Sequence, residues 1–199
     1  YYGLVSFMDA NMGRVLDALE AAGLKENTQV IYTSDHGDNI GERGLWGKSN
    51  LFEESAGVPL IAAGPGFPAG RTCKTPASLV DVYPTLLSEA GVEVPADRPG
   101  TSLVKLANQP DDSDRVVFSE YHAMGAATGA FMIRKGQWKL VHYVGMAPEL
   151  YDLSADPGEV NDLGESATHE AIRADLMDEL SKICNPDDVN GRALTEQRA

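Results

Sequence analysis

Cysteine is scarce in this sequence of 199 residues, which contains only Cys73 and Cys184. Two cysteines cannot form a disulfide framework, and neither belongs to a Cys-x-x-Cys metal or redox motif. Long apolar runs are lacking too, since no stretch approaches the ~20 residues that a transmembrane helix requires. We therefore expect no disulfide scaffold and no association with a membrane. The sequence opens at Tyr1, without a methionine and inside a helical pattern, so we expect further chain before it.

Basic residues are also few, because 16 Lys and Arg stand against 30 Asp and Glu and give a formal net charge of -14. A surface of this charge repels phosphate backbones, so nucleic acid is not an expected partner. The simpler consequence of an acidic surface is solubility. With 43% hydrophobic and 23% charged residues, the sequence can bury a sizeable core and is not disordered by composition.

The residue types that carry chemistry concentrate in residues 30–48. Residues 30–33 favour a short buried strand, and Asp35, His36 and Gly37 follow its C-terminal end. A carboxylate oxygen and an imidazole nitrogen both suit a divalent metal, while a glycine lets the backbone turn away. Ligands of open α/β sheets bind beyond the carboxyl ends of the strands. We therefore predict that the functional loop runs from Asp35 to Lys48.

Hydrophobic periodicity predicts two structural parts. The first part contains amphipathic helices and strands at 1–22, 30–33, 58–63 and 78–90. Their order predicts a mainly parallel sheet with helices on its faces. Ser78 and Asp81 resemble a capping arrangement at the start of the helix at 78–90. The second part contains four short strands, predicted at 115–120, 130–134, 139–143 and 149–153.

Successive short strands joined by a tight hairpin turn at 135–137 predict a small antiparallel sheet. A closing helix is expected at 168–183, ended by Asn185-Pro186, with the remaining residues as a tail. We place the boundary in the polar, proline-containing stretch between the two parts. Residues 1–110 are then the C-terminal part of a large α/β domain, and residues 111–199 a small α+β subdomain.

Several short motifs occur in a fixed order along the chain, namely Asp35-His36-Gly37, Gly44-Leu45-Trp46-Gly47-Lys48, Val58-Pro59-Leu60-Ile61, Leu150-Tyr151-Asp152-Leu153 and Asp156-Pro157-Gly158-Glu159. This series resembles the sulfatases of the alkaline phosphatase superfamily, in particular their choline-sulfatase-like and arylsulfatase-like branch. The resemblance covers nearly the whole chain, but only the C-terminal portion of such an enzyme. It implies an alkaline-phosphatase-like α/β sandwich and metal-dependent hydrolysis of sulfate esters.

The resemblance also implies roles for individual residues. Asp35 and His36 match metal-binding positions, with Ca²⁺ the first expectation and Mn²⁺ or Zn²⁺ the alternatives, because imidazole suits the latter two better. An alternative catalytic role for His36 is a hydrogen bond to the substrate or leaving group. Lys48 resembles the lysine that contacts the sulfuryl and leaving-group oxygens. His122 is a candidate substrate-binding residue, and a packed core histidine is the alternative interpretation.

The nucleophile of the family lies outside these motifs. In sulfatases it is a cysteine or serine in a Cys-x-Pro-x-Arg type motif, converted to formylglycine, whereas Cys73 is followed by Lys74-Thr75-Pro76-Ala77. We therefore expect formylglycine and further metal ligands in a missing N-terminal half, and no activity from this chain alone. The carboxylates of Glu53 and Glu54 are expected at the surface, and the alternative is that they orient residues of the site.

The expected partners are a small-molecule sulfate ester, the missing N-terminal half and a second copy of the chain, because an uncovered sheet associates readily. The expected compartment is a bacterial cytoplasm or periplasm. One alternative function is that of a phosphonate monoester or phosphodiester hydrolase of the same superfamily. Another is that of a non-catalytic fragment that complements or binds metal.

Overall fold

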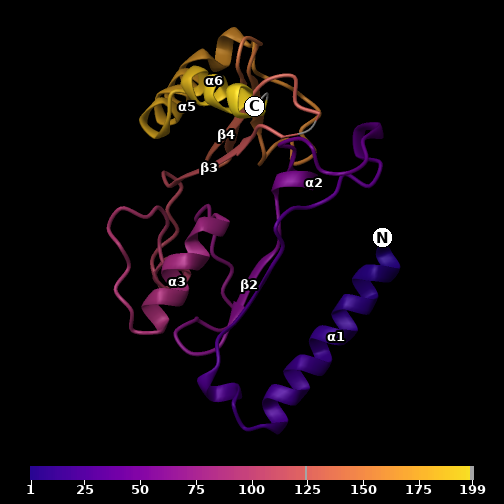
Figure 1. Ribbon diagram of the computed structural model, residues 1–199, viewed down its shortest axis with the longest axis vertical. Helices are drawn as coiled ribbons and strands as arrows, with labels where there is room; N and C mark the ends of the chain where they lie inside the picture. Colours follow the sequence, from indigo (N-terminus) through magenta and orange to yellow (C-terminus); the bar gives the residue numbers. More distant parts are fainter. Residues whose placement is uncertain (124, 198–199) are drawn as a thin grey trace.

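The computed structural model describes residues 1–123 and 125–197 (Figure 1). The helices and strands are α1 (Tyr2–Ala21), β1 (Val30–Thr33), α2 (Glu53–Ala56), β2 (Leu60–Ala63), α3 (Val82–Glu89), α4 (Leu103–Asn108), β3 (Val116–Tyr121), β4 (Ala130–Lys135), β5 (Trp138–Tyr143), β6 (Glu149–Asp152), α5 (Glu170–Ile183) and α6 (Pro186–Gln197). Short 3-10 helices are η1 (Lys25–Asn27), η2 (Glu42–Gly44), η3 (Leu79–Asp81) and η4 (Ala167–His169). None of the described helices is long and apolar enough to cross a lipid bilayer.

Strands β1 and β2 form a two-stranded sheet, in which Val30 pairs with Ala63 and Thr33 with Leu60. The pairing is antiparallel, so the predicted parallel direction is wrong for these two strands. A parallel pair needs a crossover that returns the chain to the end at which the first strand began. Here the connection stays at the C-terminal end of β1 and contains only η2 and α2, so β2 runs straight back along β1 (Figure 1).

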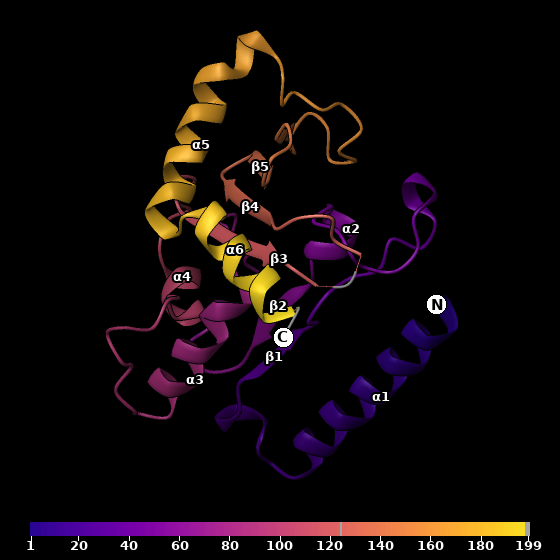
Figure 2. The same cartoon turned by 45° about the horizontal axis from the view of Figure 1, so that its top comes forward.

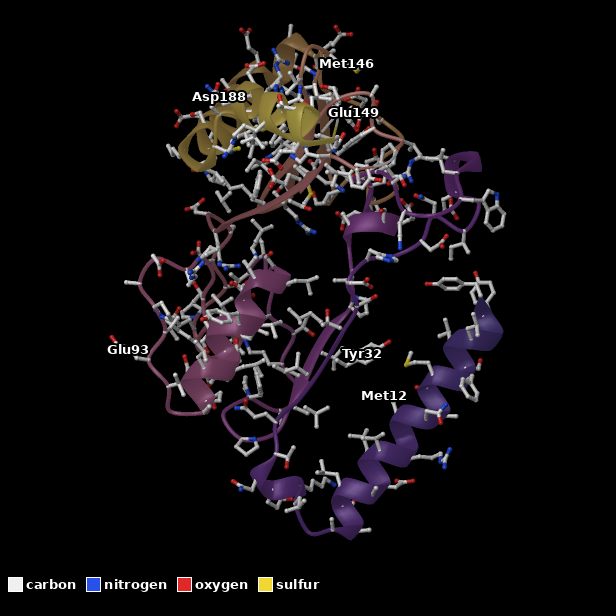
Figure 3. All side chains as sticks on the ribbon, viewed as in Figure 1. Met12, Tyr32, Glu93, Met146, Glu149 and Asp188 are labelled. Atoms are coloured by element: carbon white, nitrogen blue, oxygen red, sulfur yellow. The ribbon has the colours of Figure 1, made fainter. Side chains whose placement is uncertain are left out.

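Helix α1 lies beside this sheet without packing closely on it, and none of its described residues is buried. A groove of about 1200 Å³, which we call the α1 groove, separates the helix from the strands. Met12 of α1 and Tyr32 of β1 line its two sides (Figure 3). The predicted apolar stripe of α1 therefore faces the groove instead of a filled core.

The second sheet has the order β3-β4-β5-β6, and each strand runs antiparallel to its neighbour. This confirms the predicted small antiparallel sheet, and α5 lies along one of its faces as the predicted closing helix (Figure 2). The core between them consists of fully or almost fully buried side chains, namely Phe131, Ile133, Leu140, Leu150, Leu176 and Leu180. The opposite face of β4 places Met132 near Leu51, which belongs to the loop after β1. The domain boundary at residue 110 stays a prediction.

The C-terminal segment forms a helix, α6, where the sequence predicted only a tail. Asn185 caps it, since its Oδ1 accepts hydrogen bonds from the N–H groups of Asp187 at 3.0 Å and Asp188 at 3.3 Å. Pro186 is the first helical residue, where no intrahelical N–H donor is needed. The Asn-Pro pair that was expected to stop one helix therefore begins the next.

Asp81 joins the first sheet region to the second. The predicted pairing of Ser78 with Asp81 is present as a capping box at the start of η3. The buried Asp81 carboxylate also accepts hydrogen bonds from the N–H of Thr101 at 2.8 Å and from the Arg115 guanidinium at 2.6 Å. One carboxylate thus fixes the ends of three segments that are distant in sequence.

Candidate functional site

Strand β1 ends at Thr33, and Asp35 and His36 follow in an irregular segment. The Asp35 side chain is 84% exposed, and its Oδ1 accepts a hydrogen bond from the N–H of His36 at 3.0 Å. Desolvation alone would raise the pKa of Asp35, but the positive charge that His36 can carry and hydrogen bonds from the His36 N–H and the Ser34 hydroxyl together outweigh it and lower that pKa. Asp35 therefore presents an anionic, accessible carboxylate.

The hydrogen bonds of His36 define which ring nitrogen is available for chemistry. Nδ1 lies 2.8 Å from the carbonyl oxygen of Gly37, and because a carbonyl oxygen only accepts, Nδ1 must carry the hydrogen. In the neutral ring, Nε2 then has the free lone pair. Lys48 Nζ lies 2.5 Å from Nε2, and Asp35 Oδ2 lies 3.4 Å from it. The structure thus brings Asp35, His36 and Lys48 together.

A short backbone network holds the loop in this arrangement. The N–H of Gly37 donates to the carbonyl of Ser55 at 2.8 Å, and the Ser55 hydroxyl donates to the carbonyl of Lys48 at 2.5 Å. Helix α2 passes so close that a Cβ on Gly37 would lie 2.0 Å from the carbonyl oxygen of Glu54. Gly37 is therefore required by close backbone approach and not by a left-handed backbone conformation, which Gly41 adopts with a φ of 96°.

The three residues open onto one cavity of about 730 Å³. Its other wall comes from the second sheet and includes Ser119, Glu120 and Arg134. Sequence reasoning selected His122 from this region and not these three residues, because strand alternation tells which residues share a face but not which face meets a distant loop. The cavity therefore combines charged side chains of both signs from segments far apart in the sequence.

His122 occupies a different environment. Its ring packs edge-on against Phe131 with 5.1 Å between the ring centroids, and its Nε2 lies 3.3 Å from Glu120 Oε2. The side chain is 18% exposed and is not among the described residues that line the cavity of Lys48. This placement agrees with a packed core histidine, and a role in substrate binding stays a prediction.

The two carboxylates after Phe52 were expected at the surface, and the structure shows otherwise. Glu53 is half-buried and lies 2.9 Å from Lys139 Nζ of β5. Glu54 is also half-buried and pairs with Arg43 Nη1 at 2.6 Å. A sequence pattern could not reveal the pair of Glu53 with Lys139, because the two residues are 86 positions apart.

A family model described as N-sulphoglucosamine sulphohydrolase, C-terminal, matches residues 41–186. The chain belongs to the sulfatase family. This sulfatase chain is 42% identical over 180 residues to the choline-sulfatase of Rhizobium meliloti (strain 1021). The aligned region covers 88% of this chain and 35% of that protein. It is 36% identical over 196 residues to arylsulfatase K of Rattus norvegicus, and the aligned region covers 93% of this chain and 34% of that protein. The sulfatase chain thus spans about a third of the length of the curated relatives it matches.

Solved structures give the same result for the fold. The sulfatase chain is similar to BT4656, determined in complex with its substrate D-glucosamine-2-N,6-O-disulfate, with a TM-score of 0.82 and 35% identity over 90% of this chain and 38% of that one. It is also similar to the phosphonate monoester hydrolase of Agrobacterium radiobacter, with a TM-score of 0.79 and 29% identity over 92% of this chain and 40% of that one. These similarities confirm the predicted sulfatase-like α/β fold class.

The donor set of this sulfatase chain fits part of a metal site. Asp35 offers a carboxylate and His36 an imidazole nitrogen, 3.4 Å apart and both open to the cavity. Within residues 1–123 and 125–197, no group of three or more His, Cys, Asp or Glu side chains is placed to hold a metal ion. Because His36 Nε2 has a single lone pair, it can serve either the Lys48 ammonium or a metal ion at one time.

Proposed function

We propose that the chain is the C-terminal part of a metal-dependent sulfatase, in which Asp35 and His36 bind a divalent cation and Lys48 contacts the sulfuryl group. The observation that carries this proposal is the convergence of Lys48 Nζ and His36 Nε2, 2.5 Å apart, on one cavity in a chain of the sulfatase family. The names of the relatives refer to choline, aryl and glucosamine sulfates. The proposal therefore extends to sulfate esters as a class.

The proposed chemistry divides between this chain and the missing half. Hydrolysis breaks the bond between sulfur and the ester oxygen, and the ammonium of Lys48 offsets the negative charge that develops on that oxygen. Before a cation binds, His36 Nε2 accepts a hydrogen bond from Lys48, and Asp35 places a carboxylate beside it. His36 would give this lone pair to a bound cation and leave the Lys48 ammonium to the ester oxygen. A divalent cation, when bound, would neutralise charge on the non-bridging sulfuryl oxygens. Ca²⁺ is proposed first, with Mn²⁺ and Zn²⁺ as the alternatives that His36 favours.

The nucleophile is proposed to come from outside this chain. Cys73 lies 3.8 Å from the carbonyl oxygen of Leu106 and lines a cavity different from that of Lys48. We therefore assign formylglycine to the missing N-terminal half and expect this chain alone to be inactive. The α1 groove, with apolar residues on both sides, is where that half would pack, and a second copy of the chain is the alternative partner. A bacterial cytoplasm or periplasm stays the predicted compartment.

Lys48→Ala in the complete enzyme tests the proposal. Loss of one charge-stabilising donor is expected to lower kcat on an aryl sulfate by about 10²–10³-fold. Lys105→Ala is the matched control, because Lys105 is an exposed lysine of α4 outside the residues that line this cavity, and it should leave kcat unchanged. Equal kcat values for Lys48→Ala and the wild-type enzyme would remove Lys48 from the reaction.

The second candidate function is phosphonate monoester hydrolysis, which the similarity to the Agrobacterium radiobacter enzyme favours. A phosphonate ester also presents non-bridging oxygens to a metal ion and a lysine, so the same residues suit it. Rates measured side by side on an aryl sulfate and an aryl phosphonate separate the two functions. If the complete enzyme cleaves neither ester, the third possibility, a non-catalytic complementing fragment, gains support.

A further inference from the structure

Helix α2 is only four residues long and contacts the proposed site through Ser55. The carbonyl of Ser55 accepts the N–H of Gly37 at 2.8 Å, next to His36. Its hydroxyl donates to the carbonyl of Lys48 at 2.5 Å. The position of α2 therefore sets the positions of both His36 and Lys48.

Helix α2 also makes ionic contacts, which reach the second sheet and the loop before Lys48. We call the charged residues in these contacts the buried ion cluster, and they are Arg43, Glu53, Glu54, Arg134, Lys139 and Glu159. Lys139 and Glu159 are at its centre, and both side chains are completely buried. The distance from Lys139 Nζ to Glu159 Oε1 is 2.7 Å, but Oε1 is not aligned as a hydrogen-bond acceptor, so the attraction is that of an ion pair.

Both central residues bind α2 directly. Lys139 Nζ donates a hydrogen bond to Glu53 Oε1 at 2.9 Å. Glu159 Oε2 accepts the backbone N–H of Glu53, the first residue of α2, at 2.6 Å. Arg134 adds a contact at 3.3 Å between its Nη1 and Glu53 Oε2. The start of α2 is thus held by the second sheet and by the turn that follows β6.

Arg43 extends the cluster to the other side of Lys48. Its guanidinium pairs with Glu54 at 2.6 Å, lies 3.8 Å from Glu159, donates to the carbonyl of Gly158 and stacks on the Phe52 ring at 4.1 Å from the ring centroid. Arg43 lies five residues before Lys48, and Glu53 five residues after it. The loop that carries Lys48 is therefore fixed at both of its ends.

Stability alone explains such a cluster poorly. Burying charges costs so much desolvation that replacing a buried ion pair with apolar residues is often neutral or stabilising. The cluster balances three cations with three carboxylates, which limits that cost without turning it into a large gain. What ion pairs with fixed partners do supply is a defined geometry. The cluster supplies this geometry next to the residues that need it.

We propose that Lys139 and Glu159 are positioning residues, which hold α2 so that Lys48 and His36 keep their places beside each other on the cavity. This inference rests on the proposed function for its effect on turnover. Misplacement of a reacting group by about 1 Å is enough to slow catalysis by about 10²-fold. The second sheet thus helps to position a site whose proposed catalytic residues lie on the loop after β1.

Glu159→Gln and Lys139→Met in the complete enzyme test the proposal. Each is expected to lower kcat on an aryl sulfate by about ten-fold or more with a much smaller change in KM, because Lys48 is misplaced in the transition state. The matched control is Lys135→Met, which removes ion pairs with Asp175 at 2.9 Å and Glu179 at 3.3 Å on the opposite side of the second sheet. The control should change kcat by less than about two-fold, since surface ion pairs contribute little.

A spectroscopic measurement distinguishes a positioning role of the cluster from a purely stabilising one. The ring-nitrogen resonances of His36, assigned with His36→Gln, are expected to shift in Glu159→Gln and to stay unchanged in Lys135→Met. Wild-type kcat and unchanged His36 resonances in both cluster variants would overturn the positioning role, as would an equal loss of kcat in Lys135→Met. If the wild-type enzyme cleaves no ester, the proposed function fails, and the His36 resonances still decide the positioning role. Should Glu159→Gln not fold, Glu53→Gln, at the more accessible edge of the cluster, replaces it.

Discussion

Replacing Gly37 with alanine adds one methyl group where the backbone of α2 leaves no room. The new Cβ would lie 2.0 Å from the carbonyl oxygen of Glu54 and 3.0 Å from its carbonyl carbon. An ordinary carbon–oxygen contact is about 3.4 Å, so the two segments must separate by roughly 1.4 Å. Backbone atoms form the contact, so no side-chain rotation relieves it.

The cost of this movement follows from what it disrupts. Overpacking of this kind costs about 1–3 kcal/mol, and loss of the 2.8 Å hydrogen bond from Gly37 to Ser55 adds about 1 kcal/mol. We therefore expect Gly37→Ala to lower the free energy of unfolding by about 2–4 kcal/mol. Because α2 also positions Lys48 through Ser55, kcat should fall by about 10²-fold.

Urea denaturation and initial rates on an aryl sulfate measure the two effects in the complete enzyme. Gly13→Ala is the control, because the same methyl group meets nothing within 4 Å on α1. It should leave kcat unchanged and raise stability by up to about 1 kcal/mol, since alanine favours a helix over glycine. If Gly37→Ala keeps both the wild-type urea midpoint and the wild-type kcat, the close approach of α2 to the site is refuted.

Three further predictions concern a metal, a pH dependence and a buried ion pair. Asp35→Asn removes the anionic oxygen beside His36 and is expected to weaken metal binding by at least about ten-fold, the loss typical of even indirect metal partners, as measured by metal content after dialysis. Burial raises the pKa of Glu149 above its ordinary value of 4.5, so its ionisation opposes folding as the pH rises through that range. Glu149→Gln should therefore raise the urea midpoint at pH 7, and the difference should vanish at a pH below about 4, whereas a constant difference would refute the assignment. Asp81→Ala removes the 2.6 Å partner of Arg115 and should lower the free energy of unfolding by about 3–5 kcal/mol, and a loss below 1 kcal/mol would show that the pair is not structural.

The sequence predicted correctly those features that depend on residues close together in the chain. Residues 30–33 are β1 with the predicted bounds, and the hairpin turn after β4 contains Gly136 with a φ of 56°. The Ser78–Asp81 capping box was also predicted correctly, because both partners lie within one turn of chain. Asp35 and His36 were selected because they follow β1, whereas Lys48 was selected through the resemblance to the sulfatases.

Long-range pairing produced the errors. The direction of β2 depends on where the loop after β1 returns, and periodicity carries no information about that. Glu53 was assigned to the surface because its partner Lys139 belongs to a strand 86 residues later. For α6 the local signal was Asn185-Pro186. We interpreted this pair only as the end of the preceding helix, although Asn185 also caps α6.

The strand order β3-β4-β5-β6, which follows the order of the chain, has a consequence for folding kinetics. Each strand closes a short loop onto its predecessor, and contacts of low sequence separation form rapidly. The contacts of Arg43 with Gly158 and of Glu53 with Lys139 join residues 115 and 86 positions apart, so they carry a larger loop-closure cost. We therefore expect the sheet β3-β4-β5-β6 to form early and the loop of Lys48 to reach its final shape when it docks on that sheet.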